Sequence, residues 1–361
     1  PYLALQIKGM AYIFNVLTYG HIPFWLGALI AFGIVVIYVA TSGVRGAAWS
    51  DVFQAILMLI VAWILGIYFV ETLHGGLGNM FKSIAENDPN FLTIGKEGSA
   101  LSSARYSSNI LVSMLGFLMW PHLFTKSYTT TERRIKLTVV AYPLFAIFLL
   151  PVLFIGFSAI GVVPPDALNA PDEVLPYLIT HHLTDSGLLY GLVGAGALAA
   201  AMSSSDAITH GASVSFGRDI CKVIFPKIKE NTELWIMRGA VLGVGIVAYC
   251  SAIFGSGGLI ALLLGAYGNI VQLVPAVYAG LFWKKASALG IILGIIVGIL
   301  VNLYYQYPYV QKYFDMSISP PYDLHPGSIG LVINIIIVAV ISFAKEQDRA
   351  VIEHASKFID D

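Results

Sequence analysis

The chain is poor in charge and in cysteine. Only 11% of its 361 residues are Asp, Glu, Lys or Arg, less than half of the roughly 25% typical of soluble domains. A formal net charge of −1 excludes a nucleic-acid-binding protein that relies on bulk positive charge. The two cysteines, Cys221 and Cys250, form neither a metal-binding spacing nor a disulfide framework. These shortages exclude soluble, nucleic-acid-binding and disulfide-stabilised proteins.

Signatures of common enzymes are also absent. Neither His-Glu-x-x-His nor Gly-x-Ser-x-Gly occurs, and there is no Gly-rich phosphate loop of the Walker type. The sequence therefore favours neither an intramembrane hydrolase nor an ATP-driven pump, and we expect a protein that is not an enzyme.

The abundant residues are apolar, at 57% of the chain with a mean hydropathy of +0.79. A membrane-spanning helix needs about 20 mostly apolar residues, so we predict an all-α polytopic membrane protein. The apolar runs that carry this prediction are 2–18, 22–41, 48–72, 106–124, 136–160, 188–213, 235–254, 258–283, 286–306 and 327–344.

Loop charges orient these ten predicted spans. If the first span runs outward, fifteen Lys and Arg residues lie on the cytoplasmic side and four on the outer side, as the positive-inside rule requires. The long connections 73–105 and 161–187 are then extracytoplasmic, and the tail 345–361 is cytoplasmic. We expect residues 1–361 to form a single transporter domain. Because the chain begins at Pro1 within an apolar segment, we also expect it to be a fragment.

Two spans contain helix-breaking residues. Pro121 follows Trp120 in the fourth span and frees backbone carbonyls near Phe117. Asn269 and Gln272 share one face of the eighth span, just before a proline. An interrupted helix at membrane depth is a common way to build a transporter's solute site. A simple proline kink in a packed helix is the alternative interpretation.

The segment Gly196–Asp206, GALAAAMSSSD, places hydroxyls and a carboxylate in an apolar span. Ser203 and Ser204 lie three and four residues after Ala200, so all three share one helical face. Two hydroxyl oxygens and a main-chain carbonyl are hard ligands of the kind that sodium prefers. Serines of this kind also cap backbone carbonyls or allow close helix packing.

Four stretches together resemble the sodium:solute symporter family. They are Tyr38–Gly43 with Ala48–Gln54, Trp120-Pro121-His122 with its basic following loop, Gly196–Asp206, and the run from Gly280 through Lys285 to Gly298. The resemblance covers essentially the whole chain in order. It implies an inverted five-helix-repeat transporter in which the first span matches the third core helix, so that the first two core helices are missing.

The resemblance also implies sodium as the coupling ion. The family's principal sodium site lies between the first and eighth core helices, so this chain contributes a half site: the Ala200 carbonyl with Ser203 and Ser204. Some members bind a further sodium near the aspartate that matches Asp51. Here Asp206 and Ala207 replace two serines, which argues against a second stoichiometric sodium. We expect Asp51 and Asp206 to help sodium leave or to act as an accessory site.

Alternating access is the expected mechanism, with sodium and a small organic solute bound at mid-membrane. The expected solute contacts are Phe117, Trp120, Asn269, Gln272, Asn15 and Tyr12. The Met-Trp-Pro-His pattern and its basic loop favour monocarboxylates or related organic acids over amino acids and sugars. We expect the plasma or inner membrane as the location. The alternatives are a transport-like solute sensor and an uncoupled uniporter or channel.

Overall fold

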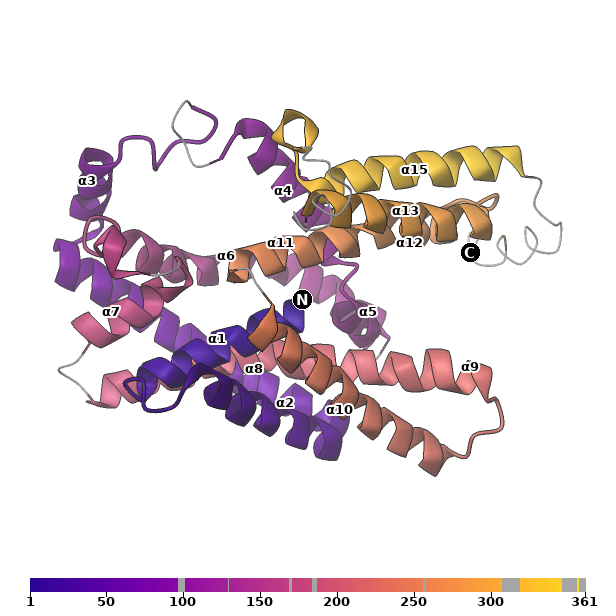
Figure 1. Cartoon of the computed structure of the whole chain (residues 1–361), viewed down its shortest axis with the longest axis horizontal. Helices are drawn as coiled ribbons and strands as arrows, with labels where there is room; N and C mark the ends of the chain where they lie inside the picture. The colour runs from indigo at the N-terminus through magenta and orange to yellow at the C-terminus, as the bar shows by residue number, and fades with distance from the viewer. Residues whose placement is uncertain are drawn as a thin grey trace. The chain divides into compact units, whose positions relative to one another are not determined.

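The computed structural model describes residues 1–96, 101–128, 130–168, 171–183, 187–255, 258–306, 319–345 and 356. Helices and turns account for all the regular structure in these ranges (Figure 1). The prediction of an all-α protein is therefore confirmed. Of the predicted tail 345–361, all but Lys345 and Ser356 lie outside the described residues.

Eight helical segments in the described ranges are long and apolar enough to cross a membrane. They are Phe24–Thr41, Gly46–His74, Glu132–Ser158, Gly187–Ile224, Glu230–Phe254, Leu259–Phe282, Ala288–Gln306 and Pro326–Ala344. The other two predicted spans form shorter helices. Span 2–18 is the 16-residue α1 (Tyr2–Leu17), and span 106–124 is divided between α4 (Ser103–Phe117) and α5 (Pro121–Ser127).

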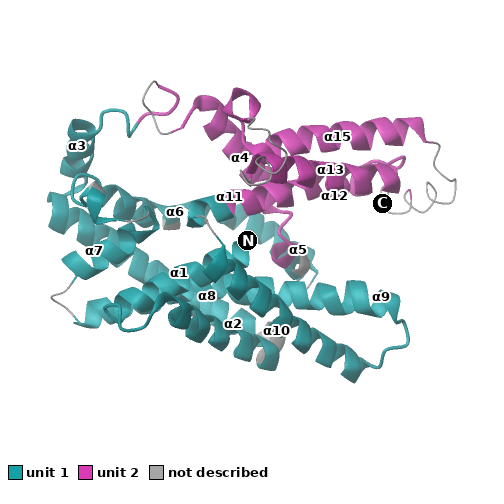
Figure 2. Ribbon diagram, viewed as in Figure 1, with its two compact units in different colours: residues 1–92, 125–262 teal, residues 93–124, 263–361 magenta. Residues whose placement is uncertain are grey.

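The chain forms two compact units (Figure 2). Unit 1 comprises residues 1–92 and 125–262, and unit 2 comprises residues 93–124 and 263–361. Unit 1 holds α1, α2 (Phe24–His74), α3 (Leu77–Asn87), α6 (Glu132–Ser158), α7 (Val174–His182), α8 (Gly187–Ser215), α9 (Lys222–Ile224) and α10 (Glu230–Phe254). Unit 2 holds α4, most of α11 (Leu259–Ile270), α12 (Val274–Phe282), α13 (Ala288–Gln306) and α15 (Pro326–Ala344).

The connection expected between the second and third spans is helical. Helical hydrogen bonding continues from Phe24 to His74 as α2, and no proline lies in the connecting sequence Thr41–Ala47 to interrupt it. The long connections also contain helices. α3 buries Met80 and Ile84, and α7 buries Leu178 and Ile179. The helices α3 and α7 of these connections thus pack within unit 1.

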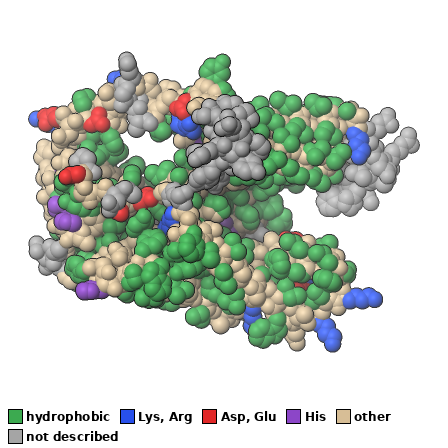
Figure 3. Space-filling model, viewed as in Figure 1, with side chains coloured by type: hydrophobic (Ala, Val, Ile, Leu, Met, Phe, Trp, Pro, Cys, Tyr) green, Lys and Arg blue, Asp and Glu red, His purple; other side chains and the backbone are tan. Residues whose placement is uncertain are grey.

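The core of unit 1 lies where α1, α2, α8 and α10 meet. Ile7 and Met10 of α1, Val35 of α2 and Val241 of α10 are buried there. Outward-facing positions carry large apolar side chains such as Leu29, Ile64 and Ile246, and hydrophobic side chains cover much of the visible surface (Figure 3). An apolar exterior over helices of membrane length is what a lipid-facing surface requires.

Candidate functional site

The serine segment of α8 presents two of its three hydroxyls on a less buried face. Ala200 is exposed and Ser203 and Ser204 are half-buried, whereas Ser205 is fully buried. The Ser203 hydroxyl donates to the Ala200 carbonyl over 3.0 Å, and Ser205 donates to Ala201 over 2.8 Å. The structure thus brings the three predicted ligands onto one face of α8 and turns Ser205 into the helix packing.

Asp206 begins a separate polar cluster in unit 1. Its side chain is fully buried, and its Oδ2 accepts from the Tyr38 hydroxyl over 2.7 Å and from the Ser50 hydroxyl over 3.3 Å. The Gln54 amide lies within hydrogen-bonding reach of Tyr38. Both halves of α2 therefore converge on a carboxylate of α8.

Asp51 lies beside this cluster and forms an ion pair with a lysine. Its Oδ2 accepts from Lys126 of α5 over 2.9 Å, and Asp51 is close enough to act electrostatically on Asp206. Three buried oxygens have no hydrogen-bond donor among the described residues: Asp51 Oδ1, Gln54 Oε1 and Asp206 Oδ1. Among the side chains that the structure describes here, two carboxylates face one ammonium, an excess of negative charge that suits a monovalent cation.

The predicted break in the fourth span is confirmed. α4 ends at Phe117 and α5 begins at Pro121. The Trp120 amide makes a long 3.5 Å contact with the Phe117 carbonyl, and Pro121 has no N–H to donate to it. Trp120 is buried and meets Tyr267 of α11 edge-to-face, with 5.3 Å between ring centroids. Phe117 and Trp120 therefore lie at a true interruption, in unit 2.

The eighth span is interrupted as well. α11 passes through a 3₁₀ turn, η4 (Val271–Leu273), into α12, which has Pro275 in its first turn. Gln272 is fully buried there, and its Nε2 donates to the carbonyls of Gly268 and Gly327 over 3.0 Å each. Asn269 is half-buried and accepts from Asn302 over 2.9 Å. The Gln272 amide is thus committed to the backbone.

Asn15 and Tyr12, the remaining predicted solute contacts, lie near the end of α1. The Asn15 amide donates to the Ile22 carbonyl over 3.0 Å, which closes the turn between α1 and α2. Tyr12 packs edge-to-face on Phe24 with 5.1 Å between ring centroids. Both belong to unit 1, whereas Phe117, Trp120, Asn269 and Gln272 belong to unit 2.

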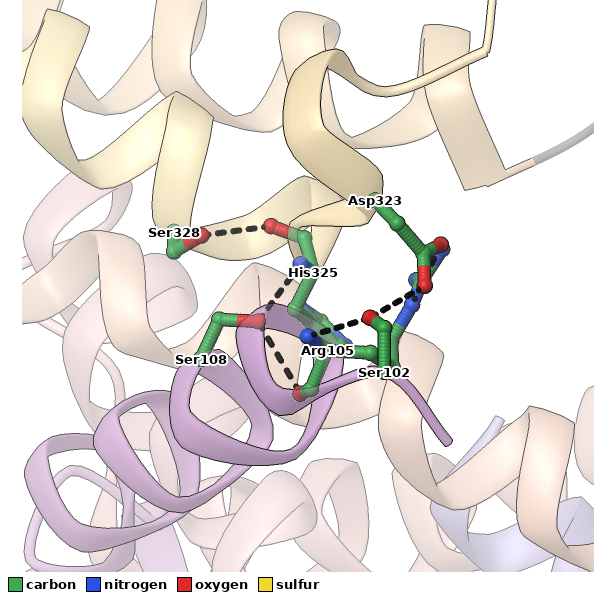
Figure 4. A network of polar contacts seen from close by, with 6 residues as sticks. All are labelled: Ser102, Arg105, Ser108, Asp323, His325 and Ser328. Atoms are coloured by element: carbon green, nitrogen blue, oxygen red, sulfur yellow. Dashed lines mark hydrogen bonds and ion pairs between the residues drawn. The ribbon is translucent and has the colours of Figure 1, made fainter. Parts of the chain in front are cut away.

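A second polar network anchors the N-terminal end of α4 in unit 2 (Figure 4). Arg105 donates to Asp323 Oδ1 through Nε over 3.1 Å, and the Ser102 hydroxyl donates to Asp323 Oδ2 over 2.7 Å. These bonds lower the pKa of the Asp323 carboxyl. The backbone N–H of His325 donates to the Ser108 hydroxyl over 2.8 Å. Burial, assisted by the nearby Arg105 charge, lowers the pKa of His325 to about 4.

The sequence predicted Asp206 and Gln272 as site residues but not the side chains that bond to them. Tyr38 and Ser50 were not predicted to bind Asp206, although both lie in the stretches that carry the family resemblance. Asn334 was also missed: it is fully buried on α15 and donates to the Gln272 carbonyl over 2.8 Å. A buried amide in an apolar span was the available signal.

Helices of membrane length, two interrupted helices and hydroxyls within an apolar helix are typical of a secondary transporter. The sodium:solute symporter family matches residues 2–298. The chain belongs to this family, whose members are transporters rather than enzymes and use Na⁺ as the coupling ion.

The relatives are symporters of bacteria and animals. The chain is 31% identical over 360 residues to an uncharacterized symporter, YhjB, of Bacillus subtilis, covering 97% of this chain and 72% of that protein. It is 25% identical to the sodium-coupled monocarboxylate transporter 2 of Bos taurus, covering 67% of this chain and 41% of the relative. It is 24% identical to a monocarboxylic acid transporter of Corynebacterium glutamicum, covering 81% and 57%.

A solved structure has the same fold. A Na⁺-coupled sialic acid symporter, in its substrate-bound outward-open state, superimposes with a TM-score of 0.69 at 21% identity. The match covers 96% of this chain and 72% of that one. The inverted-repeat transporter fold expected from the sequence is therefore confirmed, and the protein is a multi-pass membrane protein.

Proposed function

We propose that this chain supplies the solute-binding and sodium-binding helices of a symporter for small monocarboxylates. The observation that carries the proposal is the interruption between Phe117 and Pro121 beside a buried Trp120, together with two relatives whose names specify monocarboxylate transport. A small carboxylate needs a compact apolar pocket with a few oriented donors. Backbone N–H groups at a helix interruption and side-chain amides beside it provide such donors.

For the principal sodium site, we propose the Ala200 carbonyl with the Ser203 and Ser204 hydroxyls. The 3.0 Å contact between the Ser203 hydroxyl and the Ala200 carbonyl supports this, because it places two hard oxygens side by side. These residues form half of a coordination shell, since sodium needs more oxygens than three.

For sodium exit, we propose Asp51 and Asp206. Their support is the set of donor-free oxygens around them and the single ammonium of Lys126 beside two carboxylates. A cation leaving the serine face along α8 meets Asp206 less than one helical turn beyond Ser204. Because Lys126 also faces Asp51, it competes with sodium there and favours release.

For the solute, we propose contacts from Phe117, Trp120 and Asn269 of unit 2. Asn15 and Tyr12 of unit 1 stay solute contacts predicted from the sequence. Gln272 acts at the same place by holding the α11 interruption in shape, since its amide already donates to two carbonyls. Aromatic rings shield the solute from water while amides orient it.

Sodium and solute are linked by reciprocal binding: each raises the affinity for the other by the same factor. The membrane potential adds about 2.3 kcal/mol per charge per 100 mV, which drives accumulation without ATP. We propose the cell membrane as the location. The excess of Lys and Arg in alternate loops supports a C-terminus on the cytoplasmic side of it.

The test is uptake by the full-length protein in proteoliposomes, with radiolabelled pyruvate, propionate, alanine and glucose in sodium or choline medium. We expect sodium-dependent uptake of the two carboxylates. The double variant Ser203→Ala/Ser204→Ala should raise half-saturating sodium by tenfold or more, while Ser205→Ala, whose hydroxyl is buried in packing, should not. Pyruvate flux unaffected by removing sodium would indicate a uniporter, and no flux of any solute would favour a sensor.

A further inference from the structure

We infer that α15 positions the solute face of unit 2, by joining the two interrupted helices through Asn334 and His325. The family resemblance gives no role to this helix, and the family match ends at residue 298. The inference rests on the structure of unit 2 and on symport, and does not depend on which solute is carried.

The first link runs from α15 to the interruption of α11. Asn334 Nδ2 donates to the Gln272 carbonyl over 2.8 Å, and Gln272 Nε2 donates to the Gly327 carbonyl over 3.0 Å. Gln272 Nε2 also reaches the Gly268 carbonyl. Side-chain amides thus supply donors to carbonyls around a bend in which Pro275 has no N–H to give.

The second link runs from α15 to α4. The His325 N–H donates to the Ser108 hydroxyl over 2.8 Å, and His325 Nδ1 accepts from the Gly327 N–H over 2.9 Å. Ser328 closes the turn by donating to the His325 carbonyl over 2.7 Å (Figure 4). Asp323, two residues earlier, is tied to Arg105 and so to the first turn of α4.

The two links meet at Gly327, which approaches α11 closely. A Cβ added to Gly327 would lie 2.5 Å from the Gly268 Cα, so only glycine fits there. One buried apolar cluster fills the space between the three segments: Val112 and Met119, Val271 and Val274, and Leu331. Its members come from α4 and its break, from the α11–α12 bend, and from α15.

Such a network is costly to retain unless its geometry is needed. His325, Gln272 and Asn334 are each at most 1% exposed. Buried amides and imidazoles cost free energy unless they are hydrogen-bonded. The amide N–H groups of Gln272 and Asn334 and the Nδ1 of His325 are hydrogen-bonded here, whereas Asn334 Oδ1 has no donor among the described residues. The paired atoms specify one arrangement of the three segments. What they specify here is the placement of Trp120 against Tyr267, because these rings lie at the two interruptions that the links join. Asn334 and His325 are therefore positioning residues.

The experiment separates positioning from simple stability. Asn334→Ala and Ser108→Ala each remove one link in the full-length protein, and Ser108→Thr keeps the hydroxyl. Ser342→Ala is the matched control, because this buried α15 serine accepts the Ser287 N–H over 2.8 Å at the other end of the helix. Uptake of pyruvate is measured against pyruvate and sodium concentration, together with melting temperature.

We expect Asn334→Ala and Ser108→Ala to raise the KM for pyruvate about tenfold, the value of one buried hydrogen bond, with the maximal rate within twofold. At saturating pyruvate, half-saturating sodium should stay unchanged. Ser108→Thr should restore KM, and Ser342→Ala should lower only the melting temperature. If both link variants melt earlier but keep the wild-type KM, the positioning role is wrong.

The KM comparison still tests the inference if one variant fails to fold or if the protein carries another solute. If Asn334→Ala does not insert, the Ser108→Ala and Ser108→Thr pair still decides the outcome. If wild-type protein carries alanine or glucose instead of pyruvate, the monocarboxylate proposal fails. The same variants are then tested with that solute.

Discussion

Replacing Tyr38 with phenylalanine should make the protein more dependent on sodium for its stability. The Tyr38 hydroxyl donates to buried Asp206 over 2.7 Å, and phenylalanine removes that donor with almost no change in shape. Asp206 Oδ1 already has no donor within the described residues. The variant therefore leaves the buried carboxylate with the weaker 3.3 Å bond from Ser50 and a backbone hydrogen bond from Ala207, so a bound cation supplies more of the compensation.

The magnitude follows from the hydrogen bond that is lost. A bond to a charged group contributes about 1.5–3 kcal/mol. In sodium-free buffer, Tyr38→Phe should therefore lose about that much unfolding free energy. In saturating sodium, part of the loss is recovered, because an ion that competes with Tyr38 for the Asp206 oxygens now binds without a competitor. The sodium concentration that gives half of the stabilisation should therefore fall. The decrease is roughly 10-fold if sodium recovers half of the 3 kcal/mol upper bound.

Thermal unfolding of detergent-purified protein across a sodium titration, with choline as the balancing ion, measures this effect. Tyr190→Phe is the matched control, because its hydroxyl donates to the Val16 carbonyl over 2.6 Å and bonds to no carboxylate of the described residues. The control should lose about 1 kcal/mol equally at every sodium concentration. Asp206→Asn, which keeps the shape and removes the charge, should shrink the sodium-dependent stabilisation. If Tyr38→Phe loses the same stability with and without sodium, Asp206 does not bind the ion.

Two further predictions concern pH and packing. Because burial gives His325 a pKa of about 4 against 6.5 when unfolded, the unfolded chain binds more protons between these values. Unfolding free energy should thus fall by about 2 kcal/mol from pH 7.5 to pH 5, and a melting curve unchanged over this range in wild type and His325→Gln alike would contradict it. Gly66→Ala should lower the unfolding free energy by about 1–3 kcal/mol, because the added Cβ would lie 2.8 Å from the Pro151 carbonyl oxygen. Gly33→Ala is the control, because an added Cβ there has nothing within 4 Å. Equal melting temperatures of the two variants would refute the close approach.

Local chemistry made several features predictable from sequence. Pro121 cannot donate a hydrogen bond, so the break after Phe117 follows from one residue. The helical spacing of Ala200, Ser203 and Ser204 fixes their common face. Long apolar runs predicted most of the membrane helices within a few residues. Each of these inferences needs information from fewer than about 25 neighbouring residues.

Features that depend on distant partners were not predictable. Tyr38 and Asp206 are 168 residues apart, and no local pattern indicates that they touch. Gln272 shows the same limit in reverse. The spacing of Gln272 from Asn269 predicts that the two residues share a face. The Gln272 amide instead donates to the carbonyls of Gly268 and Gly327, and Gly327 is 55 residues away. Periodicity identifies a face, and only the fold decides what that face meets.

The two buried polar regions differ in the charge of their unpartnered atoms. Around Gln272, the amide N–H groups of Gln272 and Asn334 donate to backbone carbonyls. The oxygens there without a donor among the described residues, Asn302 Oδ1 and Asn334 Oδ1, are neutral, so this region is suited to hold a shape. Around Asp206, oxygens outnumber donors among the described residues, and the excess charge is negative. An unmatched set of buried oxygens costs free energy until a cation arrives. The hydrogen bonds of the first region favour rigidity, and the charge of the second fits the sodium-exit role proposed for Asp51 and Asp206; coupled transport requires both.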